Sequence, residues 1–287
     1  AGLFVGLGLA TKTSLLPILI AFGAAHFIYL YQFISVHRTR NRPIFTERLK
    51  GVIQGLVFGL GIAIVAFFVA QPYAILDWQH FFADWTEQSE MVRRIRDYPY
   101  TRQYVSTVPF WYHIRQIATW GLGWPLGIAV WISLAFATLR GMNRQATGLY
   151  VVFGLLLPAA LLIIFDNGLC LVLAGIVAGL SIVATLPVRR PESRLDVLML
   201  AWVVPYFVII GSFEVKFMRY MLPVVPFMLL LTARTGVVLW GNSGKIPWPR
   251  LYENLPFWSK GFAVAGYDLP RRMLSVVAIG TVAFTIF

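Results

Sequence analysis

The sequence is poor in charge. Asp, Glu, Lys and Arg make up 13% of its 287 residues, whereas soluble domains carry about 25%. Hydrophobic residues make up 59%, above the usual range of roughly 45–50%. Because so few charges cannot cover a water-facing surface, this composition excludes an ordinary soluble domain. It predicts a chain whose surroundings are partly lipid.

Other absences narrow the function. Cys170 is the single cysteine, so the chain forms no internal disulfide. The phosphate-binding patterns GxxxxGK[ST] and GxGxxG do not occur, so the sequence does not indicate a nucleotide-binding role. The four histidines lack the spacing of metal ligands, and we expect no metal or other cofactor. The chain opens and closes within apolar runs, which favours an excised part of a longer protein.

Long apolar runs dominate what is present. A membrane-spanning helix needs about 20 mostly apolar residues, with a range of roughly 17–25. Glycines four residues apart, such as Gly51, Gly55 and Gly59, favour close packing of helices. The sequence predicts an all-α, polytopic transmembrane bundle that forms one domain over residues 1–287, and Ala1–Ala10 resembles the end of a further span. The eight predicted spans are Leu15–Val36, Gly51–Ala70, Ala118–Leu139, Gly148–Phe165, Gly168–Leu186, Val197–Phe213, Tyr220–Trp240 and Met273–Phe287.

The basic residues predict an orientation. There are 24 Lys and Arg against 12 Asp and Glu, and 16 of the 24 fall on one side when the loops alternate. The positive-inside rule places that side in the cytoplasm. This placement accounts for the basic excess without a nucleic-acid partner, and it predicts a multi-pass protein of the cell (inner) membrane. The basic loops are His37–Lys50, Arg140–Thr147, Val188–Asp196 and Gly241–Arg272, with Arg234 nearby.

The one long loop on the opposite, outer side is Gln71–Ile117. Within it, Ile75, Trp78, Phe82, Trp85 and Val92 keep helical spacing, and four acidic residues fill the other side. This pattern predicts an amphipathic helix over Ile75–Val92 that lies at the membrane interface. The four acids, Asp77, Asp84, Glu87 and Glu90, could serve as a base, but their place on the polar face favours simple solvation.

Two groups of cations at outer helix ends are candidates for a binding site. Lys12 lies in a short polar stretch between two apolar runs, where an ammonium needs a partner or must extend toward water. Lys216 and Arg219 lie three residues apart, so on a helix they would share a face, followed by Tyr220. Such cations suit a phosphate at headgroup depth. Ordinary anchoring of helix ends, with Lys216 paired to Glu214, is the alternative.

A third candidate is the tyrosine-rich stretch Asp97–Tyr104 in the outer loop. Its aromatic rings and the cation Arg102 could hold a sugar, with Tyr104 closing the stretch. Tyrosines that only mark the membrane interface explain the same pattern.

Four segments resemble a known family. The segment GLFVGLGLATK, which ends at Lys12, is similar to a segment of protein mannosyltransferases and lipid A aminoarabinose transferases. The segment KFMRYMLP, which begins at Lys216, is similar to another. Pro72–Asp77 and Pro99–Tyr104 resemble outer-loop sequences of bacterial phospholipid-carrier-dependent glycosyltransferases. The resemblance runs from the first residues to about Ala233.

This resemblance implies a GT-C type fold and transfer of a sugar from a polyprenyl-phosphate donor to an acceptor at the outer face. The substrate-binding residues would be Lys12, Arg102, Tyr104, Lys216, Arg219 and Tyr220. Lys12 and Arg219 would meet the donor phosphate, supported by Tyr220. The family's catalytic carboxylate lies in a first outer loop that we do not find, so no catalytic residue is assigned. The identities of the sugar and of the acceptor stay open.

Two other functions explain the same spans and cations. A transporter or lipid flippase would move a substrate past them, although transporters often carry paired broken helices and charges at the bilayer midplane. A subunit that only scaffolds an envelope complex would need neither catalysis nor transport.

The charge bias makes the topology testable. We expect a cysteine introduced at Gln88 to react with a membrane-impermeant thiol reagent in intact cells, because Gln71–Ile117 faces out. We expect cysteines introduced in His37–Lys50 and Gly241–Arg272 to stay unlabelled under the same conditions. If the Gln88→Cys variant is labelled only after the membranes are opened, the orientation is the opposite of the predicted one.

Overall fold

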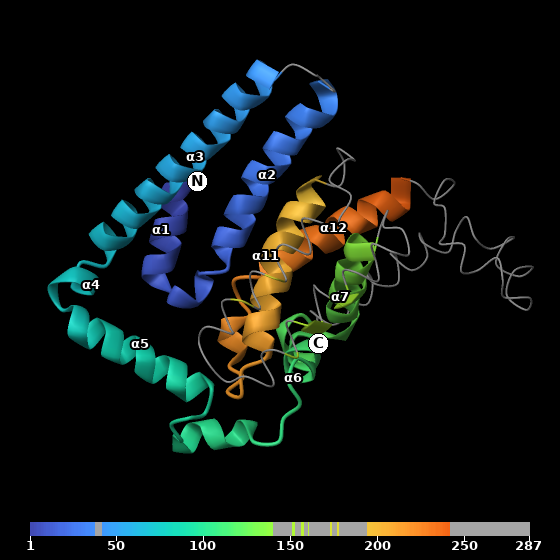
Figure 1. Cartoon of the computed structure of the whole chain (residues 1–287). Coiled ribbons are helices and arrows are strands. Elements are labelled where there is room, and N and C mark those ends of the chain that lie inside the picture. Colours follow the sequence, from blue (N-terminus) through green and yellow to red (C-terminus); the bar gives the residue numbers. More distant parts are fainter. Residues whose placement is uncertain are drawn as a thin grey trace, which may run out of the picture. The chain divides into compact units, whose positions relative to one another are not determined.

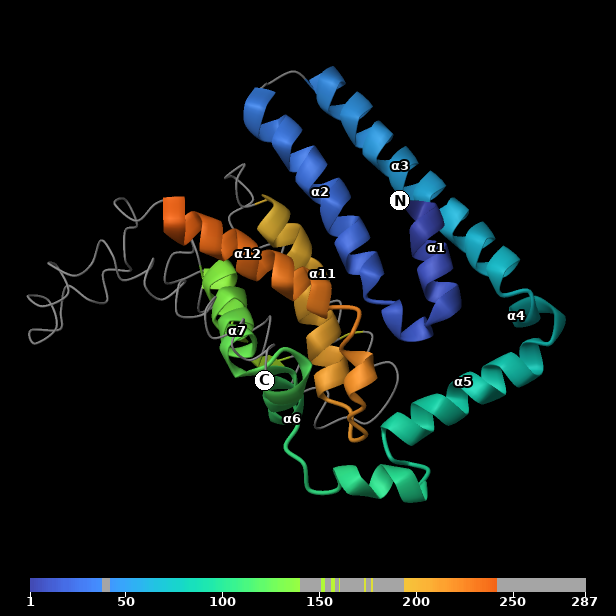
Figure 2. The same ribbon diagram turned by 180° about the vertical axis from the view of Figure 1, so that it is seen from behind.

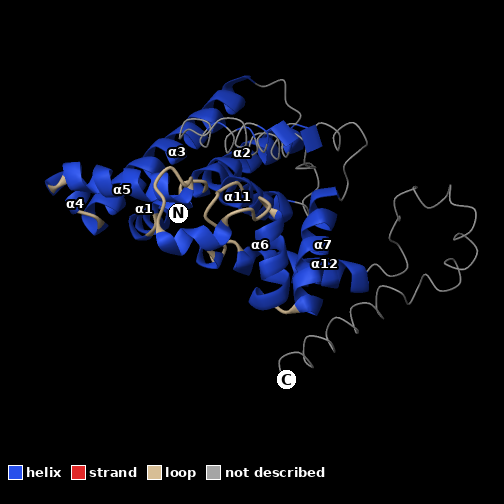
Figure 3. Ribbon diagram, turned by 90° about the horizontal axis from the view of Figure 1, so that it is seen from below, coloured by secondary structure: helices blue, strands red, loops and turns tan. Residues whose placement is uncertain are grey.

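The computed structural model describes residues 1–37, 42–139 and 194–241, with a few isolated positions between 151 and 177. Within these ranges the chain is helical and contains no strand, which confirms the all-α prediction (Figures 1 and 3). In order, the helices are α1 (Gly2–Thr11), α2 (Ile18–His37), α3 (Arg42–Ala70), α4 (Tyr73–Leu76), α5 (Trp78–Val92), α6 (Trp111–Gln116), α7 (Trp124–Leu139), α11 (Arg194–Gly211) and α12 (Val225–Gly241). Short 3₁₀ turns occur at Thr13–Leu15, Pro99–Tyr104 and Met218–Tyr220.

Three helical stretches are long and apolar enough to cross a membrane: Thr13–Leu30, Thr46–Ala70 and Arg194–Gly211. They confirm that the chain carries helices with the length and composition of membrane spans. The shorter apolar helices α1, α7 and α12 fall below that length. The predicted spans Gly148–Phe165, Gly168–Leu186 and Met273–Phe287 lie outside the continuously described ranges.

Backbone contacts divide the chain into two compact units. Unit 1 comprises Ala1–His113 and Thr138–Val224, and unit 2 comprises Ile114–Ala137 and Val225–Phe287. In unit 1, α1 packs along α3, and α2 packs against both α3 and α11 (Figures 1 and 2). The interior of unit 1 includes most of α11, whose residues are far more buried than those of α2 or α3.

The contact between α1 and α3 is a close approach of two backbones. A Cβ atom at Gly2 would overlap the carbonyl oxygen of Gly59, and one at Gly6 would overlap that of Ala63. Val5, which lies between the two glycines, is buried with Phe22 and Ala63. Small residues four apart therefore let α1 lie directly on α3, which is the packing mode common in membrane helices.

Two predicted spans begin later than expected. The run Ala118–Leu139 is not one helix, because a π-helical turn over Ile117–Gly121 is followed by Gly123 with a φ of 76°, and α7 starts at Trp124. Glycine adopts that left-handed conformation without steric cost. The run Tyr220–Trp240 begins with a 3₁₀ turn, and α12 starts only after Pro223, whose missing N–H does not support a continuing helix.

The predicted amphipathic helix is present but starts later than Ile75. Asp77 leaves the helical conformation (φ −135°, ψ 54°), ends α4, and accepts a hydrogen bond of 2.7 Å from the ring of His80 in α5. Along α5, Trp78, Phe82 and Trp85 follow one another in edge-to-face contact and are exposed. In both Figures 1 and 2, α5 runs steeply across the direction of α1, α2 and α3. Its membrane contact stays a prediction.

The backbone contact at Gly6 predicts that alanine at this position lowers stability, although alanine normally stabilises a helix relative to glycine. We expect Gly6→Ala to lower stability in detergent by roughly 1–3 kcal/mol, because the added methyl group has no room against α3. Gly61→Ala is the matched control, since Gly61 faces open space on α3 and alanine favours a helix over glycine by about 0.5–1 kcal/mol. Denaturant titration followed by circular dichroism measures both. Equal midpoints for the two variants would contradict the close packing.

Candidate functional site

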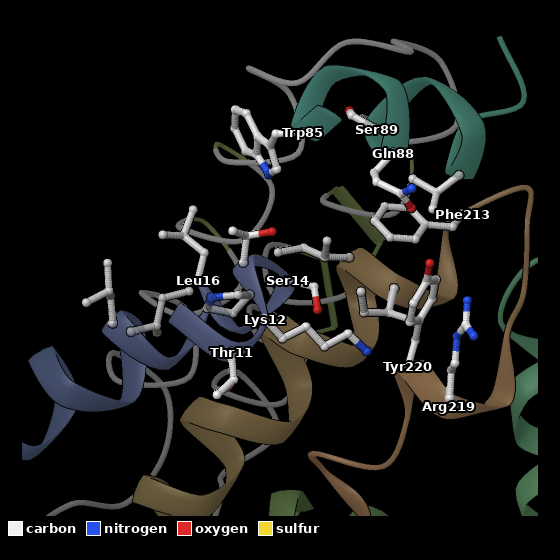
Figure 4. Close-up of a pocket in the computed structure, with 17 residues that line it drawn as sticks. Thr11, Lys12, Ser14, Leu16, Trp85, Gln88, Ser89, Phe213, Arg219 and Tyr220 are labelled. Atoms are coloured by element: carbon white, nitrogen blue, oxygen red, sulfur yellow. The ribbon is translucent and has the colours of Figure 1, made fainter. Parts of the chain in front are cut away.

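Unit 1 contains a cavity of about 890 Å³. Its walls come from the turn between α1 and α2, the first turn of α2, the second half of α5, the end of α11 and the 3₁₀ turn Met218–Tyr220 (Figure 4). Most of the lining is apolar. The residues that line it are Thr11, Lys12, Thr13, Ser14, Leu16, Pro17, Leu19, Ile20, Trp85, Gln88, Ser89, Val92, Ile209, Ile210, Phe213, Arg219 and Tyr220.

Lys12 enters the cavity because α1 ends immediately before it. The residue is extended (φ −157°, ψ 110°), while its N–H and the hydroxyl of Thr11 both donate to the carbonyl of Gly8. The Lys12 ammonium then lies 4.3 Å from the centre of the Tyr220 ring, a cation–π contact (Figure 4). Burial lowers the pKa of Lys12, and the nearby charge of Arg219 lowers it further. An anion bound here would offset both effects.

Tyr220 and Arg219 are positioned by α11. The hydroxyl of Tyr206 donates to the main-chain carbonyl of Tyr220 at 2.5 Å, and the indole N–H of Trp202 donates to the carbonyl of Pro223 at 3.3 Å. The guanidinium carbon of Arg219 lies 4.6 Å from the Phe217 ring centre and 5.8 Å from that of Tyr220. Figure 4 shows the Tyr220 ring between Lys12 and Arg219. The cations of Lys12 and Arg219 therefore both lie beside the ring of Tyr220.

The outer loop is held to this segment by an aromatic cluster of Tyr98, Tyr100, Tyr104 and Phe217. Tyr98 stacks on Tyr100 with ring centres 5.6 Å apart, and Tyr100 stacks on Phe217 at 6.4 Å. Tyr104 meets Phe217 edge-on at 5.5 Å. Because the guanidinium of Arg219 lies over the ring of Phe217, the aromatic cluster helps to position that cation.

Three of the six residues predicted for substrate binding line the cavity: Lys12, Arg219 and Tyr220. Arg102 does not, because its exposed guanidinium pairs with Asp97 at 2.9 Å. Tyr104 is buried in the aromatic cluster, where its ring supports Phe217. Burial raises the pKa of Tyr104, whose hydroxyl thus stays neutral. The structure gives the tyrosine-rich stretch a packing role.

Lys216 also lies away from the cavity. The expectation that it shares a helical face with Arg219 is wrong, because Phe217 is extended (φ −69°, ψ 126°) and the 3₁₀ turn begins only at Met218. Lys216 is fully buried, and its ammonium donates to the main-chain carbonyl of Glu214 at 3.0 Å. Burial lowers the pKa of Lys216, which Glu214 partly opposes. Beside it, burial and the charge of Lys216 lower the pKa of His113 to about 4, so this imidazole is neutral.

Sequence reasoning missed the contribution of α5 to the cavity. Trp85, the adjacent pair Gln88 and Ser89, and Val92 lie three or four residues apart along α5 and line it. Their spacing was the available signal, since Gln88 and Ser89 lie on the same face of the helix as Trp85 and Val92. Phe213 was assigned to a span and not to a site, and it follows the end of α11 at the cavity wall.

The charged side chains that line the described cavity are all positive. Its lining contains a lysine and an arginine and, within the described ranges, no Asp, Glu or His. The described residues also contain no cluster of three or more His, Cys, Asp or Glu side chains suited to a metal. A site with apolar walls and two cations suits an anion that carries a long apolar chain.

Comparison of the chain with protein-family models, with curated proteins and with solved structures finds no match. The cavity itself is therefore the basis for a functional proposal.

The coupling of the two cations can be measured. In Arg219→Gln, we expect the pKa of Lys12 to rise, because the repulsion that lowers it is removed. The pH profile for acylation of Lys12 by an amine-reactive reagent, quantified by peptide mass spectrometry, should then shift to higher pH. Arg48→Gln is the control, since Arg48 lies on α3 and bonds to Tyr29. An unchanged profile in Arg219→Gln would show that the two charges do not interact.

Proposed function

We propose that this chain is part of a membrane glycosyltransferase with a GT-C type bundle, and that the cavity binds the phosphate of a polyprenyl-phosphate sugar donor. The observation that carries the proposal is the convergence of Lys12 and Arg219 on Tyr220 in a largely apolar cavity. The two segments that meet there, GLFVGLGLATK and KFMRYMLP, are those whose sequences resemble such transferases. The site would face the outer side of the cell membrane.

The chemistry of such a transfer explains why cations are needed. The bond between the anomeric carbon of the sugar and a phosphate oxygen breaks, and its electron pair stays on that oxygen. An acceptor hydroxyl forms the new bond to the sugar and gives its proton to a base. As the bond breaks, the phosphate gains a second negative charge, so fixed cations stabilise the transition state more than the bound donor.

The surroundings of the two cations fit this role. The cavity walls from α2 and α11 are aliphatic, which suits a prenyl chain. The guanidinium of Arg219 can donate two parallel hydrogen bonds to a phosphate, whereas the ammonium of Lys12 acts as a compact charge. No carboxylate lines the described cavity, so the base that accepts the proton comes from elsewhere in the protein.

Replacing Arg219 tests the proposal in the full protein. We expect Arg219→Ala to lower kcat for sugar transfer from a polyprenyl-phosphate donor by roughly 100–1000-fold, the usual loss when one transition-state contact is removed. Arg219→Lys should recover only part of the rate, because lysine lacks the planar fork. Turnover is measured per folded molecule, and Arg48→Gln serves as the surface control.

The alternatives give different results in the same assay. If Arg219→Ala only lowers the yield of folded protein and leaves turnover normal, the arginine is structural and the proposal fails. If the full protein moves a lipid phosphate between bilayer leaflets without transferring sugar, the transporter or flippase function replaces it.

A further inference from the structure

Among the described residues, the side chains that line the cavity carry positive charge without a lining carboxylate to balance it. In the part of the chain that the structure describes, neither Lys12 nor Arg219 pairs with a carboxylate. Two acids of α5 and one of the loop after it are paired with other cations: Glu87 and Glu90 contact Arg96, and Asp97 contacts Arg102. Two positive charges thus face one open, largely apolar cavity.

We propose that this cavity selects lipid phosphates by their charge, and binds a phosphate monoester with two negative charges more tightly than a phosphodiester with one. This inference rests on the proposed function and adds a regulatory consequence to it. The sugar donor is a phosphodiester, whereas the lipid left after transfer is a phosphate monoester. The released lipid phosphate therefore competes with fresh donor, and transfer is subject to product inhibition.

The charge count gives the physical reason. A diester neutralises one of the two cations and leaves the second without an anionic partner beside the apolar walls, where Lys12 is partly buried. The second pKa of a phosphate monoester is about 6, so most of it carries two charges at pH 7.5. That dianion offers a separate charge-assisted contact to Lys12 and to Arg219. It also relieves the repulsion between them.

We expect the pH dependence of this selectivity to follow the charge of the phosphate ligand. The ionisable groups that line the described cavity are Lys12, Arg219 and Tyr220, and Tyr100 and Tyr104 lie alongside. Burial raises the pKa of Tyr220, and Arg219 opposes that rise. The walls from α2, α5 and α11 add no acidic or basic side chain. Between pH 5 and 7.5, the monoester itself changes charge.

Direct binding measures this selectivity. The two probes are decyl phosphate and methyl decyl phosphate, which share one alkyl chain and differ in charge. At pH 7.5 in detergent, we expect the full protein to bind decyl phosphate at least about tenfold more tightly, the value of one added charge-assisted contact. At pH 5 most of the monoester carries a single charge, and the preference should largely disappear.

Variants and a third probe identify the source of the preference. Lys12→Gln should bind the two esters with similar affinity, and Arg219→Gln repeats the test if Lys12→Gln does not fold. Arg48→Gln should keep the full preference. Inorganic phosphate should compete poorly, because it lacks the alkyl chain; competition as strong as that of decyl phosphate would assign the site to free phosphate and overturn the lipid part of the proposal.

The outcomes separate this inference from the proposed function. If the unmodified protein binds both esters equally at pH 7.5, charge selection is wrong while donor binding stands. If it binds the monoester more tightly but Lys12→Gln keeps that preference, the cavity cations are not its cause. If the folded protein binds neither ester, both the inference and the proposed function fail.

Discussion

The contact between the Lys12 ammonium and the Tyr220 ring is the interaction on which the site depends. It joins the turn after α1 to the segment after α11 at a distance of 4.3 Å from ammonium to ring centre. Each partner is held by its own structure: Lys12 by the end of α1, and Tyr220 by the hydrogen bond from Tyr206. A cation–π contact contributes about 0.5–2 kcal/mol, so it offsets only part of the cost of removing an ammonium from water.

That partial compensation makes the cavity receptive to an anion. Arg219 lies beside the same ring and lowers the pKa of Lys12, so the two cations oppose each other when the cavity is free. Lys216 shows the contrasting case, because it is buried, bonded to a main-chain carbonyl and placed beside a neutral His113. The three cations of these two segments thus lie in different surroundings: Lys216 is buried within the fold, whereas Lys12 and Arg219 face the cavity.

The loop Gln71–Ile117, which we predict to lie outside, contributes to the site through packing. Its tyrosines join Phe217, which supports Arg219, and the N–H of Val215 donates to the carbonyl of Val92 at 3.1 Å. Through these contacts the end of α5 reaches the cavity, while Trp78 and Phe82 keep an exposed aromatic face. A helix with both features connects the cavity to the surface that we expect to meet lipid.

Composition and the length of the apolar runs were enough to predict that the described chain is helical. They were also enough to predict helices that are long enough to cross a membrane. The sequence also singled out Lys12, Arg219 and Tyr220, because cations beside apolar runs are unusual. The expectation that Lys216 and Arg219 share a helical face was wrong, since a three-residue spacing places two side chains on one face only if the backbone between them is helical, and Phe217 is extended. Only the tertiary structure decided that Lys12 meets Tyr220, and that α5 lines their cavity. Such contacts depend on how α1 packs on α3 and α2 on α11, and no local spacing encodes the packing of helices distant in sequence.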